Sequence, residues 1–326
     1  MTDPLLPTER VVPGPTTSAT EGRIVLEPVR ALWIAGMSLG GIIGVAFFPS
    51  WSAAALFLGL SAITLCAGHS VGMHRLLIHR SFKTPLWVEH MLVYLGTLVG
   101  MAGPFGMIRA HDMRDWHQRQ AVCPPHPSHG ARFFKDAYWQ LCCTFRLASP
   151  PEFHIESRVR EDRFYRVLDA TWMWQQLPVA ALLFALGGIG WVLWGVCLRV
   201  SVSLIGHWSV GHIAHRRGHQ GWVVEGLPVQ GYNLTRLAFV TFGESLHGNH
   251  HAFPHSALLG VERGQADLGF LFVRLLRGLG LAYDVRGPDS APARDGLRRV
   301  DPVWHLGGEK DRTVPRTSPP TVPSAA

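Results

Sequence analysis

The stretch ALWIAGMSLGGIIGVAFF (residues 31–48) carries no charged side chain along its whole length. A helix that spans a bilayer needs about 20 predominantly apolar residues, so this stretch is close to the required length. A second uncharged stretch, AAALFLGLSAITLCAG (residues 53–68), follows after a short break. Two successive uncharged blocks would be hard to cover in the core of a soluble all-α protein. They predict two helices inserted in a membrane.

Two further apolar blocks lie downstream. LWVEHMLVYLGTLVGMAGPFGM (residues 86–107) contains Glu89 and His90 near its start, where an interfacial position costs little. Residues 177–206 are long enough for two spans, and the Gly-rich GGIG at 187–190 predicts a break between them. We therefore predict an all-α integral membrane protein with four transmembrane helices, arranged as two hairpins.

The charge distribution agrees with a membrane setting. Only 16% of the residues are charged, 12 residues are Trp, and the formal net charge is +7. No basic run interleaves with aromatic residues as a nucleic-acid platform requires, so we expect no nucleic-acid partner. Arg and His concentrate in residues 69–84, in 108–176 and from 207 onward. The positive-inside bias places these regions and both termini in the cytoplasm.

The two ends of the chain differ in composition from the part between them. Residues 1–29 and 288–326 are rich in Pro, Thr, Gly or Ser and lack a sustained apolar period. They predict disordered tails on either side of one membrane domain at 30–287. The five cysteines are odd in number and show no C-x-x-C spacing. This pattern argues against a disulfide framework and against thiolate metal sites.

Histidine is the most informative residue type, with 18 copies in the chain. The stretch TFGESLHGNHHAFPHSA (residues 241–257) holds His247, His250 and His251 at positions i, i+3 and i+4. MHRLLIHRSF (residues 73–82) holds His74 and His79. Five positions apart on a straight α-helix, these two rings would diverge by about 140°. They therefore serve one metal only at a helix end, or serve two neighbouring metals.

Two more clusters complete the pattern. In RAHDMRDWHQRQ (residues 109–120), His111 and Asp115 are four residues apart on one helix face, so both side chains point to one centre. WSVGHIAH (residues 208–215) supplies His212 and His215. A donor set of imidazole and carboxylate without cysteine suits iron, copper or zinc, and the carboxylates of Asp115 and Glu244 favour iron. Histidines outside the clusters are expected to be structural: His69, His90, His154, His219 and His305.

Four motifs, in this order and between apolar blocks, resemble the membrane fatty acid desaturases of the acyl-CoA desaturase type. They are GMHRLLIHRSF (72–82), IRAHDMRDWHQRQ (108–120), WSVGH (208–212) and GESLHGNHHAFPHSA (243–257). The resemblance implies four transmembrane helices that hold a cytosolic cap, with a non-haem centre of two iron ions at their junction. It implies O2-dependent insertion of a double bond into a long fatty acyl chain, usually nine carbons from the carboxyl end. It also implies an external electron donor of the ferredoxin, rubredoxin or cytochrome type.

The resemblance and the clusters together predict the ligands of two Fe²⁺ ions: His74, His79, His111, Asp115, His212, His247, His250 and His251. Glu244 is expected to orient one ligand imidazole through its free N–H. The chain departs from the family pattern at Arg114 and Asp115, where the family usually has two histidines, and at Trp208, where it usually has Asn. A guanidinium has no acceptor and cannot ligate a metal. Additional candidate ligands are His117, His207 and His215.

The predicted function is O2-dependent desaturation of a fatty acyl thioester or an acyl lipid. An aliphatic C–H bond offers no handle to an acid or a base, so a metal oxidant fits this chemistry better than side-chain catalysis. The nearest alternative is a di-iron hydroxylase or oxidase of a lipid or a tailored acyl chain. The alternative from another class is a non-enzymatic membrane metal-binding protein or transporter, but such a protein would carry its ionisable residues inside the spans.

Overall fold

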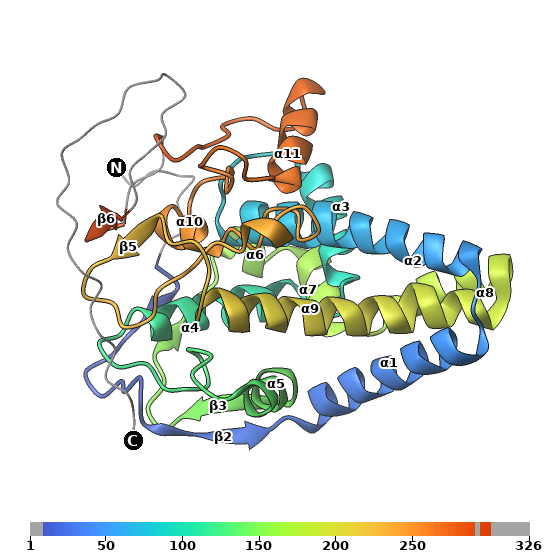
Figure 1. Ribbon diagram of the computed structural model, residues 1–326, viewed down its shortest axis with the longest axis horizontal. Helices are drawn as coiled ribbons and strands as arrows, with labels where there is room; N and C mark the ends of the chain where they lie inside the picture. Colours follow the sequence, from blue (N-terminus) through green and yellow to red (C-terminus); the bar gives the residue numbers. More distant parts are fainter. Residues whose placement is uncertain (1–8, 291–293, 301–326) are drawn as a thin grey trace.

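The computed structural model describes residues 9–290 and 294–300, and it is mostly helical (Figure 1). Three helical stretches are long and apolar enough to cross a membrane: Pro28–Phe47, Trp51–Ile78 and Gln176–Ala214. The first is α1 (Pro28–Phe47), and the second joins α2 (Trp51–Ile63) to η1 (Thr64–Ile78). The third joins α8 (Gln176–Val192), η2 (Leu193–Leu198) and α9 (Arg199–Ala214).

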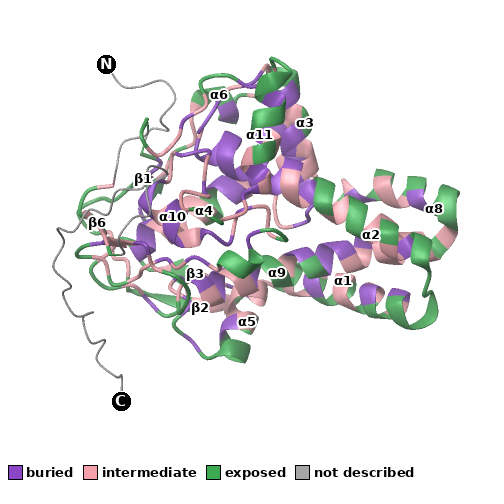
Figure 2. Cartoon of the chain, turned by 45° about the horizontal axis from the view of Figure 1, so that its top comes forward, coloured by how far each residue is buried: buried purple, intermediate pink, exposed green. Residues whose placement is uncertain are grey.

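These helices carry exposed apolar residues, and Figure 2 shows exposed and half-buried positions along α1, α2 and α8. Leu32, Phe47 and Trp51 are 73%, 75% and 93% exposed. An exposed apolar surface of this extent marks an interaction with a membrane or with another protein. Together with the length of the stretches, it identifies the chain as a membrane-associated protein.

Small residues let the membrane helices approach one another closely. A Cβ atom on Gly40 of α1 would lie 2.7 Å from the Sγ of Cys197, and one on Gly44 would lie 2.9 Å from the Cβ of Leu193. Both partners lie in η2, against which α1 packs. Glycine at these positions therefore brings the two backbones together, as small residues do in membrane helix pairs.

The expected break in the last apolar block falls at Gly188. This residue has φ +69° and ψ −166°, which is not helical. A positive φ is accessible to glycine because it lacks a Cβ atom. Beyond this point the chain turns back, so that α8 packs against η2 (Figure 1).

The end of η1 is a π-helix, in which backbone N–H groups bond to carbonyls five residues earlier. The amide of His79 donates to the carbonyl of His74 at 3.0 Å. Residues five apart therefore lie nearly above one another, in contrast to the divergence expected on a straight α-helix. His79 is the residue that terminates the helix.

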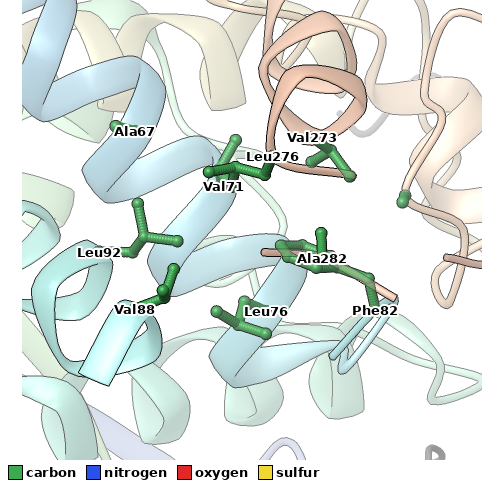
Figure 3. Close-up of a cluster of buried hydrophobic side chains, with 10 residues drawn as sticks. Ala67, Val71, Leu76, Phe82, Val88, Leu92, Val273, Leu276 and Ala282 are labelled. Carbon is green, nitrogen blue, oxygen red and sulfur yellow. The ribbon is translucent and has the colours of Figure 1, made fainter. Parts of the chain in front are cut away.

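The apolar block at 86–107 does not form a candidate span. It folds as α3 (Leu86–Thr97), which at 12 residues is about 18 Å long and too short for a bilayer core. Its side chains pack instead on η1 and on α11 (Leu268–Gly278). Val71, Leu92 and Val273 meet in this core (Figure 3).

The remaining helices form the end of the molecule that lies away from the α1–α2 loop (Figure 1). They are α4 (Pro104–Gln118), α5 (Phe133–Cys142), α6 (Ser157–Arg160), α7 (Arg163–Ala170), the short η3 (Thr235–Leu237) and α10 (His247–Ala252). A second core holds Met73 and Leu77 of η1 against Ile108 of α4 and Tyr165 of α7. This core fixes α4 beside the end of η1, where the histidines gather.

The described part of the chain is mostly helical, in agreement with the all-α prediction, but it also contains three small antiparallel sheets that were not predicted. They pair β1 (Val11–Val12) with β4 (Glu152–Phe153), β2 (Gly22–Leu26) with β3 (Cys143–Leu147), and β5 (Trp222–Val224) with β6 (Leu297–Arg299). The strands are short and each pairs with a distant segment, so their local pattern in the sequence is weak.

The same sheets also give structure to parts of the two segments that were expected to be disordered tails. Within residues 9–29, β1 and β2 pair with strands in the middle of the chain, and within residues 294–300, β6 pairs with β5. The rest of the expected tails, residues 1–8, 291–293 and 301–326, lies outside the described residues.

Arg10 anchors the N-terminal segment to the helical core. Its Nη1 lies 2.7 Å from an oxygen of Asp112, and its Nη2 lies 2.8 Å from an oxygen of Glu156. Nη2 also donates to the carbonyl of Ile78 at 3.1 Å, at the end of η1. The Arg10 side chain is 3% exposed. Composition cannot reveal such contacts, because the partners lie more than 60 positions away.

We predict that Arg10→Met destabilises the protein by about 3 kcal/mol, because it leaves two partly buried carboxylates without their cation. Thermal unfolding of the detergent-solubilised protein, followed by Trp fluorescence, measures the loss. Arg23→Met is the matched control, since Arg23 is exposed on β2. Equal unfolding temperatures for the two variants would show that Arg10 does not anchor the segment.

Candidate metal centre

Two groups of imidazoles meet at the end of η1. The first group contains His74, His79, His111 and His250, and the second contains His215, His247 and His251. Within each group the candidate ligand nitrogens all lie within 4.8 Å of one another. The side chains come from η1 and its last residue, from α4, from the end of α9 and from α10. Such convergence of neutral donors is the arrangement that a metal ion requires.

The π-helical end of η1 builds half of the first group. It brings the rings of His74 and His79 to 4.8 Å between centroids. Nε2 of His79 also lies 3.2 Å from Nε2 of His111. Nδ1 of His250 is buried and has no hydrogen-bond partner in the described part of the chain. A buried imidazole nitrogen without a partner is costly, and a cation that binds it removes this cost.

Carboxylates lie behind two of these imidazoles. Nδ1 of His111 lies 2.9 Å from an oxygen of Asp112, and Nδ1 of His74 lies 2.6 Å from an oxygen of Glu244. A carboxylate that accepts the Nδ1 proton leaves the Nε2 lone pair for a metal and fixes the ring orientation. Asp112 is the carboxylate that Arg10 binds, so the N-terminal segment supports the site from outside.

Arg75 holds Glu244 in place. Its Nη1 lies 2.9 Å from Glu244, its Nη2 lies 2.9 Å from Asp267, and its Nε donates to the carbonyl of Ala257 at 2.9 Å. Burial by itself would raise the pKa of the Glu244 carboxyl, but His74 and Arg75 outweigh burial and hold this pKa below its ordinary value. Glu244 is therefore an anion beside the His74 ring.

In the second group, one nitrogen faces two others. Nε2 of His247 lies 3.0 Å from Nε2 of His215 and 3.1 Å from Nε2 of His251. One neutral nitrogen cannot donate to two partners, whereas a cation between the three satisfies all of them. Nδ1 of His215 donates to the carbonyl of Gln230 at 3.1 Å, which leaves its Nε2 as the lone-pair atom. The amide of Gln118 lies 3.0 Å from the same Nε2.

Helix α10 supplies ligand candidates to both groups. His247 and His251 are four residues apart and share one face, so both enter the second group. His250 enters the first group. The ring centroid of His250 lies 5.8 Å from that of His247 and 5.9 Å from that of His251. The two groups are therefore neighbours, joined by one turn of helix.

The imidazoles on α10 are neutral at pH 7. Burial lowers the pKa of His247 and of His250 well below the ordinary value, and neighbouring histidines lower both further. Burial, with Arg294 as the next cause, lowers the pKa of His251 to about 4. Neutral imidazole is the form that binds metals, so the donor set fits a metal without prior loss of a proton.

Asp115 does not join either group, in contrast to the expectation from its spacing. Its oxygens lie 3.2 and 3.4 Å from Nη2 of Arg294, and one lies 3.1 Å from Nε of Arg119. Burial alone would raise the pKa of the Asp115 carboxyl, but Arg294 and Arg119 outweigh burial and lower this pKa to about 2. Arg294 and Arg119 both pair with the Asp115 carboxylate. Arg294 comes from the segment that was expected to be disordered.

His212 lies outside the two groups and forms, with His129 and Asp136, a third group of possible metal ligands, whereas His215 lies in the second group. Nδ1 of His212 lies 2.8 Å from Oδ2 of Asp136, which also accepts from Nδ1 of His129 at 2.9 Å and from Nε1 of Trp208 at 2.8 Å. Trp208, which stands at the usual Asn position, thus takes part in this buried network. His129 and Asp136 could not be recognised from the sequence, because neither lies in a repeated spacing.

The other two additional candidates are not brought into either group. Nδ1 of His117 donates to the carbonyl of Met113 at 2.7 Å, and the His207 ring packs edge-on against His69 at 5.1 Å. The isolated histidines of the described part also stay outside the groups. His90 lies 2.9 Å from Asp162, His154 lies 3.1 Å from Glu152, and His305 lies outside the described residues.

Comparison with known proteins finds relatives that are named as fatty acyl desaturases. An sn-1 stearoyl-lipid 9-desaturase of Anabaena variabilis is 33% identical over 277 residues, which is 84% of this chain and 99% of the relative. An acyl-CoA 5-desaturase of Anemone leveillei is 32% identical over 248 residues, 76% of each chain. A chloroplastic palmitoyl-monogalactosyldiacylglycerol delta-7 desaturase of Arabidopsis thaliana is 31% identical over 246 residues, 74% of this chain and 64% of the relative. No family model matches the chain.

The chain belongs to the fatty acid desaturase family. It is therefore an oxidoreductase that acts on fatty acyl substrates. This confirms the resemblance drawn from the four histidine motifs. The histidine clusters are compatible with the metal binding that the family assignment leads one to expect.

The burial of neutral imidazoles predicts how the metal-free protein responds to pH. Because the folded-state pKa of His251 is about 4 and the ordinary value is about 6.5, the unfolded chain binds more protons below pH 6.5. Stability is therefore fully present above this pH and is lost as the pH falls towards 4. Thermal unfolding of chelator-treated protein at pH 8, 7, 6 and 5 measures the effect.

Two substitutions separate this cause from general acid sensitivity. His251→Gln removes a buried titrating ring and should flatten the pH dependence, whereas His154→Gln changes an exposed ring and should not. A metal-free protein whose unfolding temperature is constant between pH 7 and 5 would contradict the prediction.

Proposed function

We propose that the chain is an O2-dependent di-iron desaturase that introduces a double bond at carbon 9 of a long acyl chain carried on a lipid. The observation that carries this proposal is the pair of neighbouring imidazole groups, of four and three histidines. Two groups that share helix α10 fit two metals rather than one. The relative of Anabaena variabilis, 99% of whose length is aligned, is named a stearoyl-lipid 9-desaturase and supports the carrier and the position.

The proposed ligands follow from the two groups. His74, His79, His111 and His250 would hold one iron ion, and His215, His247 and His251 would hold the other. Bound ferrous iron supplies the one-electron, O2-dependent chemistry that an unactivated C–H bond requires. In this proposal Asp115 and His212 support the site through their partners and are not ligands.

The chain's own residues orient this centre. Asp112 accepts the Nδ1 proton of His111 and keeps its Nε2 free, and Glu244 lies 2.6 Å from Nδ1 of His74, where its negative charge orients that ring. Arg75 and Arg10 neutralise these two carboxylates and fix their positions. Positively charged partners outside the imidazole layer keep the carboxylates anionic, while the layer itself remains neutral.

The overall reaction needs an electron donor. Two hydrogens leave the acyl chain with two electrons, and two more electrons and two protons complete the reduction of one O2 to two waters. The five cysteines are free, and none belongs to a metal-ligand cluster in the described part of the chain. We therefore assign the two additional electrons to a separate protein of the ferredoxin, rubredoxin or cytochrome type.

The proposed topology has four membrane crossings in two hairpins. α1 and α2–η1 form the first, and the turn at Gly188 divides the last apolar stretch into the second. The imidazole groups lie at the ends of η1 and α9. The remaining helices around them (α4, α5, α6, α7, η3 and α10) form the cap in this proposal. Arg and His are abundant in the cap, so the positive-inside bias supports a cytoplasmic site with both termini on that side.

Product analysis tests the proposal. Purified protein, reconstituted with a reduced donor and O2, is given either stearoyl phosphatidylcholine or stearoyl-CoA, and the acyl chains are analysed by gas chromatography. We expect a C9 double bond in the lipid-bound chain. A hydroxylated chain would favour the hydroxylase alternative, and an unchanged chain with every carrier would contradict an enzyme of this class.

Substitutions in the candidate metal centre test whether the activity depends on it. His250→Ala should abolish the product, and Glu244→Gln should lower the rate by about 10–100-fold, because it weakens the orientation of His74. Asp115→Asn should keep most of the activity, since its carboxylate binds arginines. His154→Gln serves as the matched control. Loss of activity in Asp115→Asn with full iron content retained would contradict the proposed role of Asp115.

A further inference from the structure

A second polar site lies outside the metal centre, between the end of η1, the start of α3 and Tyr283. A pocket with a volume of about 240 Å³ opens there, lined by Arg80, Lys83, Thr84, Glu89 and Arg158 together with apolar residues. The pocket faces the core shared by η1, α3 and α11, since Leu76 and Phe82 of that core also line it. None of the imidazoles of the metal centre lines this pocket.

The cations of the pocket exceed the carboxylates around it. Lys83 pairs with Asp284 at 2.7 Å, and Arg158 pairs with Glu89 at 2.7 Å. Glu89 also accepts from the hydroxyl of Tyr165 at 2.7 Å. The guanidinium of Arg80 has no hydrogen-bond or ion-pair partner in the described part of the chain. Glu156 also acts on Arg80 but is paired with Arg10, so one positive charge is left in excess.

A second, independent observation points to a ligand. Thr84 lines the pocket and is only 8% exposed, and its Oγ1 is buried without a hydrogen-bond partner in the part of the chain that the structure describes. A buried hydroxyl without a partner is unfavourable, and a ligand oxygen that accepts its proton once the side chain turns toward the pocket removes this cost. The first turn of α3 begins at Leu86, which also lines the pocket, and it adds the partial positive charge of a helix N-terminus.

The surroundings of the pocket are apolar and exposed. Leu86, Trp87 and Tyr283 are 54%, 60% and 48% exposed. Leu271 and Leu275 of α11 and Leu279, which caps its C-terminal end, form an exposed stripe at four-residue spacing. Helix α11 runs crosswise to α1, α2 and α9 (Figure 1), which is the orientation of a helix that lies in a membrane surface. The cations of the pocket therefore lie beside an exposed apolar surface that suits acyl chains.

We propose that this pocket, built from Arg80, Lys83, Thr84 and Arg158, binds the phosphate of an anionic phospholipid of the leaflet next to the cap. The phosphate oxygens accept from Arg80, from Lys83 and from the Thr84 hydroxyl, and the acyl chains lie against Leu86 and Trp87. Basic pockets next to membrane helices bind anionic head groups in this way. The site is independent of the metal ions and of the acyl substrate.

Lipid retention in nanodiscs tests the site. The whole protein is incorporated into nanodiscs with equal amounts of phosphatidylglycerol and phosphatidylcholine, and the lipids that remain bound are counted by native mass spectrometry. We expect wild type to retain phosphatidylglycerol in preference to phosphatidylcholine. Arg80→Gln and Lys83→Gln should each lower this preference about fivefold, and Thr84→Val should lower it without a change of charge.

The control and the competing sources have defined outcomes. Arg277→Gln, on the exposed part of α11, removes a charge outside the pocket and should leave the preference unchanged. An equal loss in this control, or no preference in wild type, would overturn the proposal. Displacement of the lipid by millimolar inorganic phosphate would show a soluble phosphate as the occupant and would also overturn it. Unchanged metal content and unfolding temperature verify that each variant is folded.

Discussion

The π-helical end of η1 is the constraint on which the candidate metal centre depends. A straight α-helix would turn His74 and His79 away from each other, whereas the hydrogen bond from the His79 amide to the His74 carbonyl aligns them. Arg75, which belongs to the same turn of η1, holds it in place, because its side chain reaches Glu244, Asp267 and the carbonyl of Ala257. The shape of one helix end therefore decides which nitrogens meet.

Charge is arranged in layers around the centre. Neutral imidazoles form the inner layer, the carboxylates of Glu244 and Asp112 contact two of them, and Arg75 and Arg10 contact the carboxylates. Each arginine also joins segments far apart in the chain, so the same ion pairs orient the ligands and fasten the cap to η1. This explains why a residue as close to the N-terminus as Arg10 belongs to the site.

The sequence predicted what depends on local pattern. Uncharged blocks located the helices that are long and apolar enough to cross a membrane, GGIG located the turn at Gly188, and the spacing of His247, His250 and His251 revealed the cluster that α10 carries. It could not predict what depends on distant partners. Asp115 has the spacing of a ligand, yet its carboxylate binds the guanidinium of Arg294, 179 positions away. His215 rather than His212 meets His247, because Asp136 binds His212, and the short strands β1 and β6 pair only with distant segments.

The central claim is that two imidazole groups hold two metal ions, with helix α10 contributing to both. Iron content per chain, measured on anaerobically purified protein with matched variants, tests it most directly. The account predicts about two irons in wild type and in Asp115→Asn, and about one in His74→Ala and in His215→Ala, because each of these histidines belongs to a single group. One iron in wild type, or the loss of both irons from Asp115→Asn, would contradict the assignment of the two groups.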